Sequence, residues 1–155
     1  TCISNQNCRN LEGLYNNIIT FTGDAKDMKF QDNNFDVVHC SATLEHVGSF
    51  ENQIKVVSEI NRLAKHYAFI STPNRYYPIE LHTKIPFVHF LPKKLFRFIL
   101  SLFGEKFFSK EVNLNLLSID DLKLICEKIK IKNYKIIRHK FLFFTSNLIL
   151  IIKKE

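Results

Sequence analysis

Acidic and small residues stand where two short apolar segments of the chain end. The first segment, residues 17–21, is followed by Asp24, and the second, residues 35–40, continues into Ser41 and Ala42. In open α/β sheets, ligands bind beyond the carboxyl ends of the strands. A carboxylate at that edge can accept hydrogen bonds from the amino group of a base or from a ribose. The Gly-Asp pair is equally typical of an ordinary turn, so both interpretations of Asp24 stay open.

Two pairs of glutamate and histidine form a second group of candidates. Glu45 and His46 are adjacent, whereas Glu80 and His82 lie two residues apart and share one side of an extended segment. The unperturbed pKa of histidine is about 6.5, so His82 is the first candidate for a general base, with Glu80 beside it. The alternative for Glu80 and His82 is a structural hydrogen bond. For Glu45 and His46 the alternative is a local helix cap or a structural pair that is hydrogen-bonded behind the binding site.

The cysteines show no functional pattern. All four are expected to be free thiols, as in a cytosolic protein, because their spacing fits neither disulfide pairs nor metal sites. His39, Cys40 and His46 match none of the usual zinc patterns, so the sequence predicts no metal site. Cys40 could in principle act as a nucleophile activated by a histidine, but no further residue pattern in the sequence supports this.

The composition is that of one globular domain spanning residues 1–155. The sequence is 46% hydrophobic and 24% charged, which argues against a disordered or fibrous chain. No apolar run approaches the roughly 18–20 residues of a spanning helix, and residues 1–6 do not resemble a signal peptide. We therefore expect a cytoplasmic location. The formal net charge of +7 favours anionic partners, but lysine is common throughout and the charge alone decides little.

The hydrophobic pattern alternates between strands and helices, which predicts a mostly parallel sheet with helical crossovers. The last two strands are joined by a short turn and should form an antiparallel hairpin. Ser49 and the capping box at residues 118–121 mark two helix starts. The predicted strands are 1–4, 17–21, 35–40, 67–71, 134–140 and 144–153, and the predicted helices are 10–16, 50–64, 93–103 and one that begins at 119.

Residues 73–92 interrupt this alternation. They contain all four prolines of the chain, several aromatic residues and His82. A long irregular segment inside a domain usually forms a lid or a binding loop. We therefore interpret residues 73–117 as an insertion within the single domain and call them the lid segment.

Several motifs, in this order and spacing, resemble the middle of a class I S-adenosylmethionine-dependent methyltransferase of the methyltransferase type 11 kind. They are Gly23-Asp24-Ala25, Phe35-Asp36-Val37-Val38 and Leu44-Glu45-His46-Val47. Residues 71–83 and 114–118 resemble a subgroup with a long insertion after its fifth strand. The resemblance implies an α/β fold with a Rossmann-like sheet. It also implies methyl transfer from S-adenosylmethionine to an oxygen or nitrogen of a small-molecule, sugar or lipid-linked acceptor.

The resemblance also implies roles for individual residues. Asp24 and Ala25 would bind the adenine, and His46 would lie beside the transferred methyl group. Ser4 stands near the position of the acidic residue that holds the cofactor ribose in the family, and a hydroxyl holds a ribose less firmly than a carboxylate. The methionine end of the cofactor would be lined by Cys40, Ser41 and Ala42. The acceptor would face Asn74, Arg75 and Tyr76, together with Glu80 and His82.

The chain departs from the family in its glycines. None of its four glycines stands in a G-x-G arrangement, so the glycine-rich turn after the family's first strand is absent. That strand lies at the centre of the family's sheet, and its absence leaves unpaired backbone groups that cost about 1–3 kcal/mol each when buried. We expect the first strand to be missing, the chain to be truncated at its N-terminus, and cofactor binding to be poor.

Three alternatives to catalysis remain. The chain could be a non-catalytic remnant. Its segment 93–103, basic at the start and apolar after it, could rest on an anionic membrane as a peripheral contact, although a helix packed over the active site explains it more simply. Nucleic-acid binding is disfavoured, because the basic residues of the C-terminal part alternate with isoleucines as in a half-exposed strand. These basic residues are Lys128, Lys130, Lys132, Lys135, Arg138 and Lys140.

Overall fold

A four-stranded sheet in the order β3-β4-β6-β5 organises this computed structural model, which describes residues 1–154. Strand β3 (Phe35–Ser41) pairs in parallel with β4 (Ala64–Pro73). Strand β6 (Phe144–Lys153) lies antiparallel to β4 and to β5 (Tyr134–Phe141), with which it forms the predicted hairpin. The α/β fold with parallel strands and an antiparallel C-terminal hairpin is therefore confirmed.

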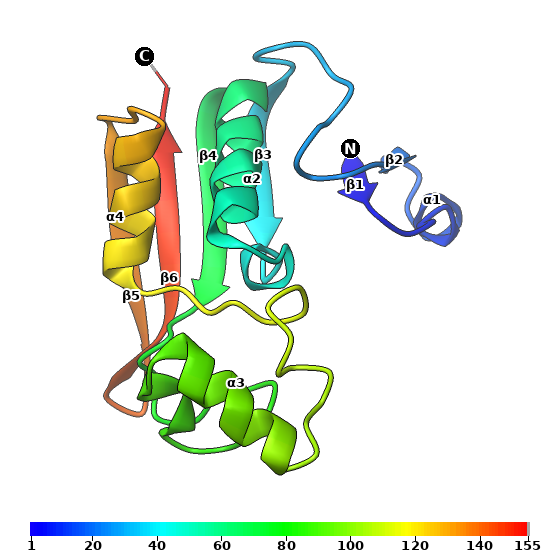
Figure 1. Cartoon of the computed structure of the whole chain (residues 1–155). Helices are drawn as coiled ribbons and strands as arrows, with labels where there is room; N and C mark the ends of the chain where they lie inside the picture. Colours follow the sequence, from blue (N-terminus) through cyan, green and yellow to red (C-terminus); the bar gives the residue numbers. More distant parts are fainter. Residues whose placement is uncertain (155) are drawn as a thin grey trace.

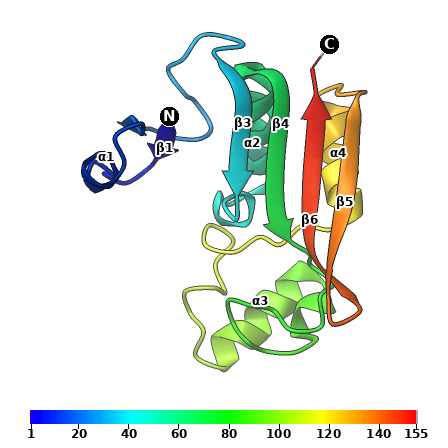
Figure 2. The same ribbon diagram turned by 180° about the vertical axis from the view of Figure 1, so that it is seen from behind.

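Two helices cover one face of this sheet (Figures 1 and 2). Helix α2 (Phe50–Leu63) begins at Ser49, whose hydroxyl accepts a hydrogen bond from the amide of Asn52 at 3.3 Å. Helix α4 (Ile119–Lys128) begins at the capping box of Ser118 and Asp121. Both predicted starts are confirmed, because a cap depends on residues within one turn of each other.

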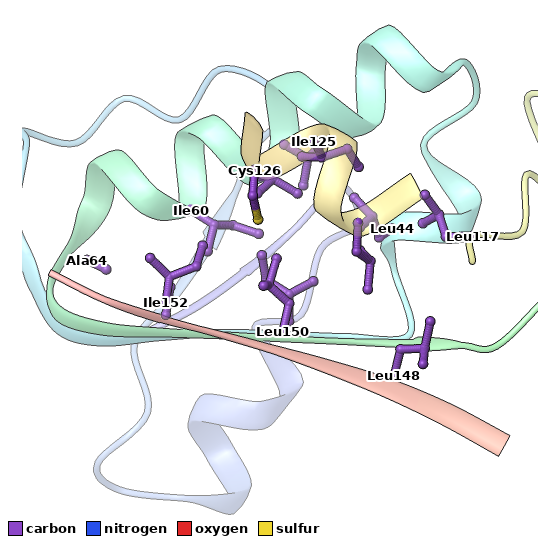
Figure 3. Packing of buried hydrophobic residues seen from close by; sticks show 14 residues of the cluster. Leu44, Ile60, Ala64, Leu117, Ile125, Cys126, Leu148, Leu150 and Ile152 are labelled. Carbon is purple, nitrogen blue, oxygen red and sulfur yellow. The ribbon is translucent and has the colours of Figure 1, made fainter. Parts of the chain in front are cut away.

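The main hydrophobic core lies between these helices and the sheet. Figure 3 shows leucine and isoleucine side chains of β6 packed beneath residues of α2 and α4. The apolar residues alternate along β6, so that every second side chain enters the core. The fully buried members include Leu44, Leu117, Leu122, Ile125, Leu148 and Leu150.

A second, two-stranded sheet lies apart from the first one (Figure 1). Its strands β1 (Cys2–Ser4) and β2 (Thr20–Thr22) are parallel and are connected through the short helix α1 (Asn10–Leu14). Strand β2 begins three residues later than predicted. Within residues 1–154 no strand pairs the two-stranded sheet with the four-stranded sheet.

Strand β3 is less buried than its apolar sequence predicted. The side chains of Val37 and His39 are exposed, Val37 to 52%, whereas Val38 and Cys40 pack against the core. A continuous apolar run is typical of a strand buried on both faces, but within residues 1–154 only helix α2 covers β3, on one face, and the other face is open.

The lid segment follows β4 and lies beyond the carboxyl ends of β3 and β4 (Figures 1 and 2). It contains the short 3₁₀ helix η2 (Val88–Phe90) and helix α3 (Lys93–Leu102), which confirms the helix predicted at 93–103. A small apolar cluster of Phe96, Leu100, Leu114 and Leu116 holds α3 to the end of the segment. Within residues 1–154 no helix has the length and apolar character needed to cross a membrane.

Candidate functional site

A cleft of about 1020 Å³ opens between the two sheets and extends along β3 to its carboxyl end. Its wall includes the end of β1, the loop after β2, strand β3 with the loop after it, part of α2, and Val112 of the lid segment. All six residues predicted to bind the cofactor lie in its wall: Ser4, Asp24, Ala25, Cys40, Ser41 and Ala42. His46 lines the same cleft. The structure thus brings these residues together, and their individual roles stay predictions.

Asp24 presents an ionised carboxylate at the edge of the cleft. Its Oδ1 accepts a hydrogen bond from the amide of Lys26 at 2.9 Å, and its Oδ2 lies 2.8 Å from the Lys26 ammonium. These contacts with Lys26 lower the pKa of Asp24. The side chain is 56% exposed, so it remains open to a polar ligand.

The loop after β3 turns sharply where it borders the cleft. Ala42 has a positive φ of 47°, and its amide donates a hydrogen bond to the carbonyl of Ser71 at 2.9 Å. The hydroxyls of Ser41 and Ser71 also lie 2.9 Å apart. Burial raises the pKa of the Cys40 thiol, so this thiol is protonated at neutral pH and is not an activated nucleophile.

Glu45 lies at the base of the lid on the 3₁₀ helix η1 (Leu44–His46). Its side chain is fully buried, and its Oε2 accepts a hydrogen bond from the hydroxyl of Thr72 at 3.0 Å. Within residues 1–154 its Oε1 has no hydrogen-bond partner. A buried carboxylate oxygen without a hydrogen-bond partner destabilises the fold, because the oxygen has lost its hydrogen bonds to water and has formed no others.

Glu80 and His82 form the pair that the sequence predicted. Glu80 is almost fully buried, and its Oε1 lies 2.6 Å from His82 Nδ1. Its other oxygen accepts a hydrogen bond from the amide of Thr83 at 2.6 Å. Burial would raise the pKa of Glu80, but the hydrogen bonds from His82 and Thr83 outweigh it and leave that pKa lowered. The same hydrogen bond to Glu80 raises the pKa of His82.

His82 also contacts His46, which is 36 residues earlier in the sequence. Their Nε2 atoms lie 3.1 Å apart, and the Nδ1 of His46 lies 2.7 Å from the carbonyl oxygen of Asn113. His46 therefore joins the cleft to the lid segment, because its ring borders the cleft and faces a lid histidine.

Comparison with known proteins connects this architecture to one family. Residues 2–71 match the model of the methyltransferase domain family. The structure superposes on an S-adenosylmethionine-dependent methyltransferase from Archaeoglobus fulgidus with a TM-score of 0.60 at 17% identity, over 98% of this chain and 75% of that chain. The family match covers a little less than half of the chain, and the superposition shows that the chain has a class I methyltransferase fold.

Other solved structures share the fold. A possible histamine N-methyltransferase from Thermotoga maritima superposes with a TM-score of 0.56 at 14% identity, covering 88% of this chain and 65% of that chain. The magnesium protoporphyrin IX methyltransferase from Synechocystis, solved with bound SAH, gives a TM-score of 0.50 at 18% identity. The superposition covers 88% of this chain and 50% of that chain. No protein of curated function matches the sequence at a significant level. The chain thus spans between half and three quarters of the length of these three structures.

The predicted acceptor-binding residues at the start of the lid segment do not reach the cleft. Arg75 Nη2 donates a hydrogen bond to the carbonyl of Leu91 at 2.8 Å, and Asn74 Nδ2 donates one to the carbonyl of Thr145 at 2.8 Å. Tyr76 is 53% exposed and stacks edge-on against Phe90. In this structure Asn74 and Arg75 hold the lid segment in place, and a role for these three residues in acceptor binding stays a prediction.

A buried polar network that the sequence did not reveal joins the lid segment to α2. The side-chain amide of Gln53 donates hydrogen bonds to the carbonyls of Leu44 at 3.0 Å and Asn115 at 2.7 Å. Asn115 in turn donates to the carbonyl of Gly48 at 2.8 Å and accepts from the Lys93 ammonium at 2.7 Å. The sequence offered little indication of this network, because nothing along the chain shows that Gln53 and Asn115, 62 positions apart, face each other.

Proposed function

We propose that this chain transfers the methyl group of S-adenosylmethionine to an oxygen or nitrogen atom of a small-molecule, sugar or lipid-linked acceptor. The observation that carries the proposal is the shared cleft: six residues assigned to the cofactor by sequence resemblance come from three segments and line one cavity. The family match over residues 2–71 and the fold of the similar structures support it. One of those structures was solved with bound SAH.

In the proposed complex, each part of the cleft binds one part of the cofactor. The carboxylate of Asp24 accepts a hydrogen bond from the adenine amino group beside Ala25, and Ser4 faces the ribose. The backbone of residues 40–42 holds the methionine end. The cleft volume of about 1020 Å³ is at the upper end of the roughly 300–1,000 Å³ typical of small-molecule sites, so it is large enough for a nucleoside-sized ligand.

The proposed chemistry is an in-line displacement at the methyl carbon. A bond forms from the acceptor oxygen or nitrogen to this carbon while the bond from carbon to the sulfonium sulfur breaks, and the acceptor loses one proton. Because the cofactor supplies the electrophile, the protein mainly has to align the acceptor and exclude water. We assign the proton to His82, with Glu80 as its buried partner, because His82 lies 3.1 Å from His46; His46 lines the cleft, whereas Glu80 and His82 do not.

Calorimetric titration of S-adenosylmethionine into the chain tests this proposal. We expect weak, saturable binding, and the D24N variant should weaken it by roughly tenfold, since a hydrogen bond to a charged group contributes about 1.5–3 kcal/mol. Asp36 is exposed on β3, and its side chain is absent from the cleft wall, so D36N is the matched control and should bind as the wild type does. Absence of any saturable heat would instead favour the non-catalytic remnant.

Exposed apolar side chains on α3 support a second, compatible role at a lipid surface. Leu95, Phe98 and Leu102 share one face of the helix and are 44%, 58% and 68% exposed. Lys94 and Lys106 are exposed nearby, as expected of a segment that rests on anionic lipid. We propose peripheral membrane contact through residues 93–103, which would suit a lipid-linked acceptor.

Vesicle sedimentation tests this membrane contact. The chain should sediment with anionic vesicles at low salt and less so at high salt, and F98S should reduce binding. Leu124 on α4 is similarly exposed, at 41%, so L124S is the control for a general loss of surface hydrophobicity. Equal sedimentation of F98S and L124S, or no sedimentation of the wild type in either salt, would contradict the contact.

A further inference from the structure

We propose that Glu45, His46 and His82 form a binding site for a divalent transition-metal ion, for which Zn²⁺ is the natural probe. The three residues come from two parts of the chain, η1 after β3 and the lid segment after β4. Each offers one ligand atom, and these atoms all lie within 4.8 Å of one another. Their sequence spacing matches no zinc motif, because the fold of the lid segment brings His82 to the other two residues.

The orientation of the two imidazole rings is the first argument. Each ring uses its Nδ1 to donate a hydrogen bond to an oxygen, His46 to the carbonyl of Asn113 at 2.7 Å and His82 to Glu80 at 2.6 Å. In a neutral imidazole, the other nitrogen then carries a lone pair. Two lone pairs would then face each other across 3.1 Å, unless a proton shared by the two nitrogens or a cation bound to both lies between them.

The second argument is the buried carboxylate. Glu45 is fully buried, and within residues 1–154 its Oε1 has no hydrogen-bond partner. This oxygen lies 3.8 Å from His46 Nε2, and the ligand atoms of the three residues all lie within 4.8 Å of one another. A cation bound by all three atoms would satisfy the oxygen and both nitrogens at once.

The spacing and the surroundings fit a metal ion. Nitrogen ligands about 2.0–2.1 Å from a tetrahedral zinc ion lie about 3.3–3.4 Å from each other. The observed 3.1 Å between the nitrogens is close to this value, the 3.8 Å from Glu45 to His46 is about half an ångström longer, and the distance from Glu45 to His82 is within 4.8 Å, so the side chain of Glu45 has to move toward the nitrogens when the ion binds. A carboxylate or a carbonyl on the far nitrogen is the usual second partner of a metal-bound histidine, and Glu80 and Asn113 supply one of each.

Three protein ligands leave at least one coordination position open. In zinc proteins such open sites are catalytic, and the fourth position holds water or substrate. Since His46 lines the cleft, the open position would receive an oxygen of the acceptor. This role rests on the proposed function and favours acceptors that present a hydroxyl over amines. A lone pair bound to a metal ion cannot also take a proton, so the base role proposed above for His82 applies to the metal-free chain and the ligand role to the metal-bound chain.

Direct metal titration tests the site without any methyl transfer. The chain is freed of metal by chelator dialysis and titrated with Zn²⁺ by calorimetry and against a chromogenic chelator. We expect one equivalent bound, and at least tenfold weaker binding for H46N and for H82N. His66 is an exposed histidine 3.8 Å from Asp36, so H66N is the matched control and should bind as the wild type does. Circular dichroism and thermal unfolding confirm that each variant is folded.

The outcomes separate the possibilities. With Co²⁺ in place of Zn²⁺, visible d–d absorption should appear in the wild type and be lost in E45Q, a variant that can keep its hydrogen bond to Thr72. Zinc binding that H66N weakens as much as H82N does would show an adventitious surface ion and overturn the proposal. Absence of stoichiometric binding would also overturn it, and a shared proton would then be the occupant. Because no cofactor is present, failure of the S-adenosylmethionine titration leaves these results unaffected.

Discussion

Replacement of Gln53 should destabilise the protein more than its position on a surface helix suggests. Gln53 is fully buried on α2, and its side-chain amide donates hydrogen bonds to the carbonyls of Leu44 and Asn115 at 3.0 and 2.7 Å. Leu44 begins η1, which carries Glu45 and His46, and Asn115 closes the lid segment. Gln53 therefore fixes the distance between η1 and the lid segment.

The expected magnitude follows from the groups that lose their partner. The Q53A variant leaves two buried carbonyl acceptors unpaired, at about 1–3 kcal/mol each. We therefore expect a loss of about 2–6 kcal/mol in the free energy of unfolding, and the small cavity left by the side chain places the value in the upper part of this range. This is a large share of the roughly 5–15 kcal/mol of a typical domain. Urea denaturation followed by circular dichroism measures it.

Two further variants separate the possible causes. Q53M keeps most of the side-chain volume but has no donor, so it should retain most of the destabilisation. Lys55 lies two residues further along α2 and is exposed, so K55A should change the free energy of unfolding by less than about 0.5 kcal/mol. If Q53A and Q53M unfold at the same urea concentration as K55A, the two carbonyls find other partners and the reasoning fails.

The remaining predictions concern the loop before β3 and the helix caps. Arg62 donates to the carbonyls of Met28 and Phe30 at 3.0 and 2.8 Å, so R62M should lower the free energy of unfolding by about 1–3 kcal/mol in urea denaturation. The hydrogen bond from Arg62 lowers the pKa of Glu59 below its unfolded value. The stabilisation by Glu59 is therefore present above the unfolded pKa and lost as the pH falls through the folded pKa, and the difference in thermal midpoint between wild type and E59Q should vanish in acid. S118A should cost about 0.5–2 kcal/mol through loss of the cap of α4, and an unchanged thermal midpoint would contradict this.

Features encoded by neighbouring residues were predictable from the sequence. The cap at Ser49, the capping box at Ser118 and the C-terminal hairpin each depend on residues a few positions apart, and all three are confirmed. The exposure of β3 was not predictable in this way. An apolar run indicates a strand, but whether both of its faces are covered depends on elements elsewhere in the chain. Val37 is apolar and still half exposed for that reason.

The same distinction separates the parts of the candidate site. The residues that line the cleft follow strands directly, and the rule that parallel strands end at one edge of a sheet was enough to group Asp24 with residues 40–42. The contact between His46 and His82 depends instead on the path of the lid segment, which is set by packing of Phe96 and Leu100. Sequence spacing carries no information about such a path, so the resemblance placed both histidines near the acceptor without joining them.

The two connections between η1 and the lid segment should act together. Gln53 and Asn115 connect them through buried hydrogen bonds, and His46 and His82 connect them at the edge of the cleft. A metal ion that binds both histidines binds only the arrangement in which the lid segment is docked, so it stabilises that arrangement by mass action. By the same linkage, a docked lid segment strengthens metal binding. Hydrogen bonds remote from the three ligands thus contribute to the affinity of the proposed site, because they hold His82 where the other two ligands can share an ion with it.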